Sequence, residues 1–230
     1  RANLTGDPNV SPSKERKEVT FPRRSGYSTS GTVLSVGEGV TAVAPGDRVA
    51  MLHTTHSQYL EVEEKNICKL ADGISFQEAA IWHISTFPLA AMRKCHLEIG
   101  ESAIVMGMGI LGMMGIKLLR AAGAAPIIAA DPVEEKRKVA LSLGADYALD
   151  PFDPDFARKV KEITAGGCNV AIEVTGNGKA LDTVRDCMAD YGRVALLCCT
   201  RNSDFTIDYY RKVHAPGITM IGAHTNARPK

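Results

Sequence analysis

The sequence predicts an α/β fold in which a doubly wound parallel sheet follows a smaller, β-rich domain. Short β-branched runs divided by Gly, Pro, Asp and Asn fill residues 31–70, as in a compact antiparallel barrel or sandwich. After residue 100, apolar runs alternate with helical patterns, and one helix opens on a Gly-x-Gly-x-x-Gly stretch. We place the domain boundary near residue 83, which gives domains at 1–83 and 84–230.

Composition narrows the classes of function. Of the 230 residues, 45% are hydrophobic, which is enough to bury one large core or two modest ones. The net charge is +1, so no broad field attracts nucleic acid or an anionic membrane. The opening residues lack a signal-peptide core, no apolar run reaches the roughly eighteen residues of a membrane span, and the six cysteines have no CxxC spacing. We expect a cytoplasmic protein with a small-molecule substrate, no nucleic acid and no membrane partner.

Turn residues define the elements of the first domain. Residues 1–24 are rich in Pro and charge and are expected to form a loop. Asp47 is interpreted as a turn residue. Ser75 and Glu78 form a capping box, so a helix should begin there. Strands are expected within 31–40, 41–52 and 58–70.

The second domain alternates strands and helices. Near-continuous apolar strands divided by helices indicate a parallel sheet covered on both faces. The expected strands are 102–107, 126–131, 169–174, 193–199 and 218–223. The helical patterns between most of them cover 110–123, 132–144 and 155–167.

The glycine-rich stretch is the first candidate site. Gly107, Gly109 and Gly112 follow an apolar strand and open a helix, and Asp131 ends the next strand, as the dinucleotide-binding fingerprint requires. Gly107 would permit the tight turn, Gly109 the close approach of a pyrophosphate, and Gly112 close packing of helix and strand. The helix N-terminus would offer free N–H donors to the phosphates. Two alternatives remain: glycines that serve packing alone, and a methyltransferase holding S-adenosylmethionine, which the barrel-like segment before the turn disfavours.

Asp131 favours NAD over NADP. Its carboxylate can accept hydrogen bonds from both hydroxyls of an adenosine ribose, whereas a 2′-phosphate at about 4 Å would be repelled by about 1–4 kcal/mol. Lys136 and Arg137 lie one turn further on and would soften this discrimination, so NADP stays possible. The alternative is a solvated acid that caps the helix beginning at Pro132.

Five stretches together resemble the medium-chain dehydrogenase/reductase family, of the zinc-type alcohol dehydrogenase kind. The resemblance covers nearly the whole chain and implies a partial GroES-like barrel domain, a Rossmann domain and an active site in the cleft between them. It also implies that further strands precede Arg1 and that a segment completing the barrel follows Lys230. The stretches occur in the family's order: GTVLSVGEGVTAVAPGDRVA, HSQYLEV, FQEAAIWHISTFPLAAMRK, VMGMGILGMMG and GADYALDP.

Many members of this family bind a catalytic zinc, but the ligand positions differ here. The family's Gly-His-Glu position reads Gly-Tyr-Ser at 26–28, and a later ligand position is Trp82. Neither a phenol nor an indole is a suitable zinc ligand. His53 and His56 have no thiol or carboxylate at ligand spacing and are interpreted as polar loop groups. The four-cysteine lobe for a structural zinc is also missing, so we predict no metal.

Without zinc, a carbonyl must be polarised by hydrogen bonds or by a proton donor. Tyr27 replaces the metal-binding His and is the first candidate donor. His83 is a candidate proton relay with a pKa suited to neutral pH, and Ser85 lies beside it, just before the family Thr, Thr86, that touches the nicotinamide. The alternatives are a core Tyr bonded to backbone and a satisfied helix His.

The resemblance assigns further contacts to the cofactor. Loops near the adenosine and near the nicotinamide map onto the segments after residues 173, 196 and 221, and strand 218–223 resembles the edge strand through which family dimers extend their sheets. We therefore expect a homodimer. With the three glycines and Asp131, the cofactor-binding residues are Thr86, Ile110, Leu111, Pro132, Lys136, Val174, Thr175, Leu197, Cys198, Gly222 and Ala223.

The sequence thus predicts an NAD(P)-dependent dehydrogenase that transfers a hydride between nicotinamide and an alcohol or carbonyl without catalytic zinc. Zinc-free relatives often reduce quinones or enones with NADPH, while Asp131 points to NAD and alcohol or polyol oxidation. A quinone or enone reductase and a dinucleotide-binding protein without turnover are therefore kept as alternatives.

Overall fold

The computed structural model describes residue 21 and residues 25–198 and 206–224. The loop expected over 1–24 lies, apart from Phe21, outside the described residues. The chain divides into two compact units, Arg1–Thr86 and Phe87–Lys230, which are described in turn. The division falls three residues beyond the sequence boundary near residue 83, and the domain assignment itself stays a prediction.

The first unit contains a three-stranded antiparallel sheet with the order β1-β2-β3. Each of the three segments expected to hold a strand contains part of one, but residues 33–40 and 58–66 form irregular backbone, turns and a short helix instead. The Glu64 carboxylate accepts Thr41 N–H at 2.8 Å and Ala42 N–H at 2.6 Å, so a side chain satisfies backbone that a neighbouring strand would otherwise pair. The elements are β1 (Ser28–Thr32), β2 (Arg48–Leu52), the short helix η2 (Glu64–Asn66) and β3 (Ile67–Lys69).

Two turn and cap predictions in this unit are confirmed. Asp47 closes a turn, since its carboxylate accepts Ala44 N–H at 2.9 Å. Ser75 N–H donates to Glu78 Oε2 at 2.9 Å and Glu78 N–H donates to Ser75 Oγ at 3.2 Å, which is a reciprocal capping box. Helix α2 (Phe76–Lys94) begins at the next residue. In the described part of the chain, no helix combines the length and apolar character needed to cross a bilayer.

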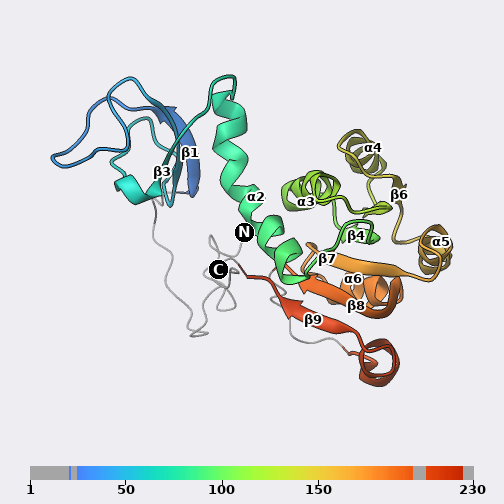
Figure 1. Cartoon of the computed structure of the whole chain (residues 1–230). Helices are drawn as coiled ribbons and strands as arrows, with labels where there is room; N and C mark the ends of the chain where they lie inside the picture. The colour runs from blue at the N-terminus through green and yellow to red at the C-terminus, as the bar shows by residue number, and fades with distance from the viewer. Residues whose placement is uncertain (1–20, 22–24, 199–205, 225–230) are drawn as a thin grey trace. The chain divides into compact units, whose positions relative to one another are not determined.

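The second unit is built on a six-stranded sheet with the order β6-β5-β4-β7-β8-β9, and every pair in it is parallel. All five expected strands are present (Figure 1). The strand expected at 193–199 instead begins at Met188 and ends at Leu196, and β6 was missed because it has only three residues. The strands are β4 (Ala103–Met106), β5 (Ile127–Ala130), β6 (Tyr147–Leu149), β7 (Cys168–Glu173), β8 (Met188–Leu196) and β9 (Thr219–Gly222).

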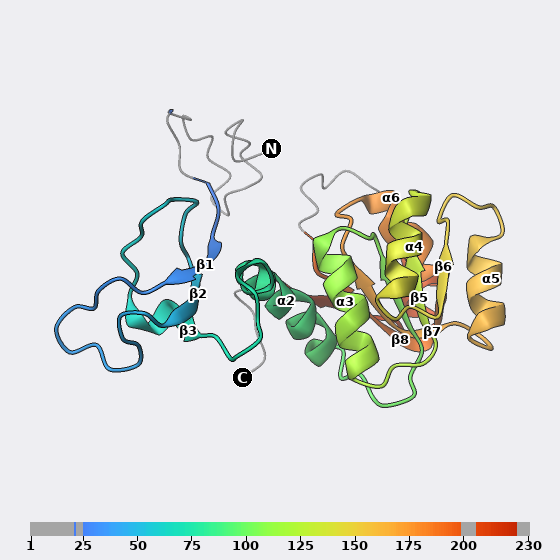
Figure 2. The ribbon, with the colours of Figure 1, turned by 90° about the horizontal axis from the view of Figure 1, so that it is seen from above.

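Helices cover both faces of this sheet. Alternate residues of β4 enter two cores: Ala103 and Val105 pack with α3 and the end of α2, while Ile104 and Met106 pack with α5 and α6. Burying each large aliphatic side chain contributes about 1.5–3 kcal/mol. Figure 2 shows α3 and α4 over the same part of the sheet. The helices are α3 (Ile110–Ala121), α4 (Glu134–Ser142), α5 (Phe156–Ile163), α6 (Gly178–Arg185) and the π-helix η3 (Tyr210–His214).

The strand order fixes where a ligand would bind. The chain runs outward from β4 to β5 and β6 on one side, then returns to start β7 on the other side of β4. Such a reversal opens a crevice at the carboxyl ends of the two central strands, where ligands of open α/β sheets bind. The residues that follow β4 and β7 are therefore the first to consider.

Candidate functional site

The residues assigned to the cofactor in the second unit gather at the carboxyl edge of the sheet. Because all six strands are parallel, their carboxyl ends meet at one edge. Backbone hydrogen bonds connect the segments that follow the strands to neighbouring strand ends. Gly107 N donates to Ala130 O at 2.7 Å, Val174 N to Met106 O at 3.1 Å, Leu197 N to Glu173 O at 3.0 Å, and Ala223 N to Leu196 O at 3.0 Å.

Each glycine of the motif occupies a position where a side chain has a distinct effect. Gly107 has φ +103°, which L side chains rarely adopt. A Cβ on Gly112 would lie 1.9 Å from the Gly107 carbonyl oxygen, so no side chain fits there. A Cβ on Gly109 would meet nothing within 4 Å, so this backbone faces open space. The turn is thus tightly packed at Gly107 and Gly112, whereas its backbone at Gly109 is uncovered.

The bare side coincides with the beginning of α3. Gly109 is the N-cap of this helix and supplies no side-chain cap, and Ile110, the first helical residue, is 48% exposed. The first N–H groups of a helix lack intrahelical partners and carry a partial positive charge. Bare backbone beside uncapped donors fits the diphosphate of a dinucleotide.

Asp131 lies beside the glycine turn and accepts a hydrogen bond from its backbone. Its Oδ2 accepts Met108 N–H at 2.8 Å and its Oδ1 accepts Val133 N–H at 2.9 Å, while the residue is only 5% exposed. A carboxylate has about four lone-pair sites, so each oxygen can still accept a further bond. Lys136 Nζ lies 3.8 Å from Oδ2, whereas Arg137 donates to the carbonyl oxygens of Asp131 and Pro132.

The loop after β7 packs directly on the turn. A Cβ on Gly107 would lie 2.8 Å from Thr175 Cγ2 and 3.3 Å from Val174 Cγ2. Sequence reasoning missed Glu173, a 1% exposed acid whose Oε1 accepts Thr175 N–H at 2.7 Å. Burial raises the pKa of this carboxyl group, and hydrogen bonds from Thr175 and Gly176 partly oppose the rise. A usable signal was present, because Glu173 ends an apolar strand as Asp131 does.

The outer loops join the same edge. Leu197 is buried, and Leu197 and Cys198 both donate backbone N–H to the Glu173 carbonyl. Lys94, at the end of α2, donates to the Gly222 carbonyl oxygen at 2.6 Å. This contact joins residues 128 positions apart, so no local signal in the sequence could have indicated it.

The proposed catalytic residues lie in the first unit, where two of them meet. The Tyr27 and His83 rings are 5.9 Å apart and nearly perpendicular, with Tyr27 48% exposed and His83 buried. Ser85 Oγ donates to the Trp82 carbonyl at 2.6 Å and Thr86 Oγ1 to the His83 carbonyl at 2.7 Å. Both hydroxyls therefore bond within α2, just before Pro88, whose ring removes one backbone donor from the helix.

The two loop histidines have separate surroundings. The His53 ring packs 5.9 Å from that of His83, so with Tyr27 and Trp82, whose rings also pack on His83, it forms a ring cluster. The His56 ring lies against Gly26, where an added Cβ would approach it to 2.2 Å. Within residues 25–198 and 206–224, no three His, Cys, Asp or Glu side chains converge as a metal-holding group.

A parallel sheet with a switch point at β4 and β7, a bare glycine turn and an acid ending the second strand define a Rossmann-type dinucleotide-binding domain. Residues 7–91 match the family described as "Alcohol dehydrogenase GroES-like domain", and residues 111–229 match "Zinc-binding dehydrogenase". The chain belongs to the medium-chain dehydrogenase/reductase family, among its zinc-type alcohol dehydrogenase-like members.

Individual relatives agree with this assignment. L-threonine 3-dehydrogenase of Thermococcus kodakarensis is 37% identical over 242 positions, covering 89% of this chain and 68% of the relative. (R,R)-butanediol dehydrogenase of Bacillus subtilis is 33% identical over 183 residues, covering 68% and 53%. The crystal structure of the 2R,3R-butanediol dehydrogenase from Bacillus subtilis superposes with a TM-score of 0.73 at 28% identity, covering 84% of this chain and 62% of that one. The chain thus spans from about half to two thirds of the length of these relatives.

Proposed function

We propose that this protein is an NAD(P)-dependent oxidoreductase that moves a hydride between nicotinamide and a small alcohol, polyol or the matching carbonyl compound. The observation that carries the proposal is the glycine turn, where Gly109 leaves bare backbone beside the uncapped start of α3. Relatives named for butanediol and for threonine support an alcohol substrate with a second polar group close to the reacting carbon.

The proposed cofactor is NAD. Backbone N–H groups at the start of α3 would bind its diphosphate, and Asp131 would accept hydrogen bonds from the adenosine ribose. When bound, the nicotinamide would supply the hydride acceptor or donor. The Thr175 methyl group and the Val174 side chain, packed on Gly107, would form one wall of the site.

Proton transfer is assigned to the ring cluster of the first unit. Oxidation of an alcohol to a carbonyl releases one proton in addition to the hydride. The Tyr27 hydroxyl is the proposed group that takes or returns this proton, and His83, whose ring packs against it, is the proposed relay. Ser85 is kept as a third candidate, although its hydroxyl proton is directed to the Trp82 carbonyl.

The proposal includes no catalytic zinc, although the family description names zinc. Tyr27 and Trp82 occupy two of the family's zinc-ligand positions. Ser28 stands where the family's Gly-His-Glu motif has Glu, and its hydroxyl donates to the Ala80 carbonyl at 2.7 Å. These donors do not fit a tetrahedral zinc site.

Two wider expectations belong to the same proposal. A homodimer would form through the edge strand β9, whose outer side pairs with no described strand; a monomer in sedimentation would contradict it. A cytoplasmic location suits the buried thiols, since burial raises the pKa of Cys95 to about 11 and of Cys187 to about 12, which keeps them as unreactive thiols.

The test compares the wild type with Gly109→Val by NADH fluorescence titration. Gly109 has φ −83° and open space around its Cβ, so the variant should fold. Its side chain would occupy the place of the diphosphate, and NADH affinity should fall by roughly 100-fold or more. Unchanged affinity in the folded variant would refute the assignment.

The same wild-type protein, purified without chelators, should contain less than one zinc per chain. It should also oxidise at least one member of a panel of small alcohols and polyols. Enone reduction with NADPH alone, or binding without turnover on any substrate, would replace the proposed activity by one of its alternatives.

A further inference from the structure

We propose that Glu173 is a positioning residue, whose side chain holds the loop beside the glycine turn in the shape that the dinucleotide requires. The inference rests on the proposed cofactor site and assigns a role to a residue that has no part in the hydride or proton transfer. It begins from the burial of the residue: Glu173 is 1% exposed at the carboxyl end of the central strand β7.

Among the residues that the structure describes, the hydrogen bonds accepted by the Glu173 side chain all come from one loop. Thr175 N–H, the Thr175 hydroxyl and Gly176 N–H converge on the single oxygen Oε1, with the backbone donors at 2.7 and 3.2 Å. Oε2 accepts Gly176 N–H at 3.3 Å. The loop at Thr175 and Gly176 is therefore bonded to the end of β7 mainly through one oxygen atom.

The main chain of Glu173 fixes a second loop. Its carbonyl oxygen accepts Leu197 N–H at 3.0 Å and Cys198 N–H at 3.2 Å. The first loop lies next to the glycine turn, because Thr175 Cγ2 approaches Gly107 and Val174, the residue after β7, donates to Met106 O. A shift of the Glu173 side chain would thus move the loop at Thr175 and Gly176 against the proposed diphosphate site.

Buried carboxylates usually carry a cation partner, since an unpaired buried charge is costly. In the described part of the chain, no Lys, Arg or His forms an ion pair with Glu173. Within the described ranges, the donors that compensate its burial are supplied by Thr175 and Gly176. The desolvation cost of the Glu173 carboxylate is therefore offset only when Thr175 and Gly176 donate to it. The loop conformation that makes these bonds is thus favoured over others.

The experiment compares Glu173→Leu with Glu173→Gln in the full chain, using NADH affinity by fluorescence and the melting temperature. The Leu variant removes Oε1 and should bind NADH roughly 10- to 100-fold more weakly. The Gln variant keeps an oxygen at the Oε1 position and should stay within about threefold of the wild type. Rescue by Gln separates loop positioning from any effect of the charge.

Ser102→Ala is the matched control. Ser102 is also buried, at 6% exposure, and its hydroxyl bonds Asn169 Oδ1 at 2.8 Å, but it lies at the amino edge of the same sheet. The Ser102→Ala variant should have a lower melting temperature than the wild type and the same NADH affinity. Hydrogen exchange adds a readout without ligand: Glu173→Leu should speed exchange at the amides of residues 175–176, whose acceptor is the side chain, and leave the amides of residues 197–198, whose acceptor is the main-chain carbonyl, unchanged.

Three results would overturn the inference. They are wild-type affinity in folded Glu173→Leu, a loss in Glu173→Gln as large as that in Glu173→Leu, and an equal loss in Ser102→Ala. If the Leu variant does not fold, Thr175→Val removes one of the converging donors with little change of shape. Its affinity should fall severalfold, and unchanged affinity and exchange would count against the role. A wild type that binds no NADH would refute the proposed function itself, a result distinct from these three.

Discussion

At the scale of single residues, the sequence motif predicted the role of each glycine. The hydrogen-bond donors that reach Asp131 and Glu173 could be identified only from the fold. The spacing of Gly107, Gly109 and Gly112 was enough to assign a turn, a bare backbone and a close contact, because each role depends on neighbours a few positions away. Asp131 differs, since Met108 N–H reaches its carboxylate across 23 positions of the chain. A local pattern cannot show that bond.

Asp131→Asn tests the choice of cofactor. The substitution removes the charge that would repel a 2′-phosphate and keeps one acceptor oxygen for the turn. Affinity for NADPH relative to NADH should therefore rise, by up to about 1–4 kcal/mol, while both bind more weakly because Met108 or Val133 N–H loses its acceptor.

The matched control is Glu134→Gln, which removes one negative charge from the exposed first turn of α4, where Lys138 pairs with that acid at 2.7 Å. It should leave the ratio of the two affinities unchanged. A wild type that already prefers NADPH would contradict the role given to Asp131. Fluorescence titration with both reduced cofactors provides the measurement.

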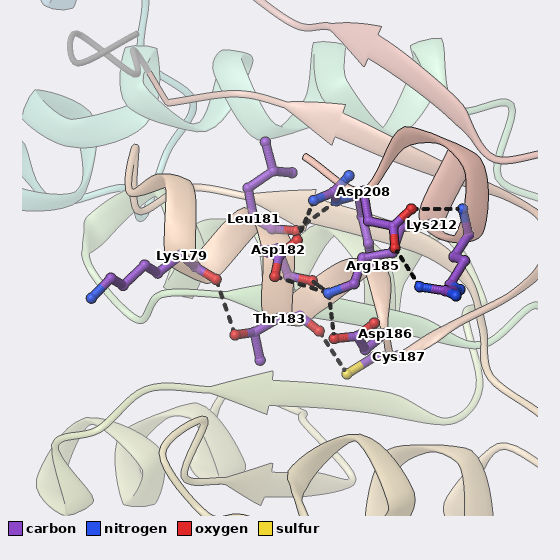
Figure 3. Close-up of polar contacts among 10 residues, drawn as sticks. Lys179, Leu181, Asp182, Thr183, Arg185, Asp186, Cys187, Asp208 and Lys212 are labelled. Carbon is purple, nitrogen blue, oxygen red and sulfur yellow. Dashed lines mark hydrogen bonds and ion pairs between the residues drawn. The ribbon is translucent and has the colours of Figure 1, made fainter. Parts of the chain in front are cut away.

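At the scale of elements, a polar network ties α6 to η3, and neither helix was expected from the sequence. Figure 3 shows the polar contacts around Asp182, which pairs with both Arg185 and Lys212. The Arg185 side chain is fully buried and donates to Asp182 Oδ1 and to the Leu181 carbonyl oxygen. Lys212 Nζ donates at 2.8 Å to both Asp182 and Asp186. Short helices rich in charge carry little periodic signal, and this pairing is tertiary.

Asp182→Ala should destabilise the protein by about 1–3 kcal/mol, because it leaves a buried guanidinium without its carboxylate. Asp186→Ala removes only a half-exposed partner of Lys212 and should cost less than about 0.5–1 kcal/mol. Urea unfolding of the two variants beside the wild type gives the comparison. Equal losses would show that Arg185 does not depend on Asp182.

At the scale of the whole molecule, the fold class was predictable and several element limits were not. Near-continuous apolar runs such as 102–107 and 126–131 indicated buried parallel strands, and the structure confirms them. The three-residue strand β6 was too short to show a pattern. The long strand β8 begins at Met188, before its expected start at 193, and carries a register shift against β7. Zinc independence, the catalytic residues and the dimer stay predictions.

The pH dependence of unfolding follows from Glu173. Burial raises its pKa above the usual 4.5, so the folded chain holds this proton at pH values where the unfolded chain has released it. This contribution is fully present below about pH 4.5 and is lost as pH rises through the raised pKa. Glu173→Gln cannot titrate and should lack the decline.

The measurement is the free energy of unfolding of both proteins between about pH 4 and pH 8. The wild type should lose stability relative to Glu173→Gln as pH increases across this range. Parallel curves would mean that the Glu173 pKa is the same in the folded and unfolded chains.

The double engagement of Asp131 also limits protein engineering. Under the proposed NAD preference, a switch to a phosphorylated coenzyme would call for replacement of this acid, yet the same carboxylate accepts the Met108 amide. A successful redesign would need to install a new acceptor for that amide in the same step. Natural variants of this chain face the same obstacle, so a change of coenzyme should require paired substitutions.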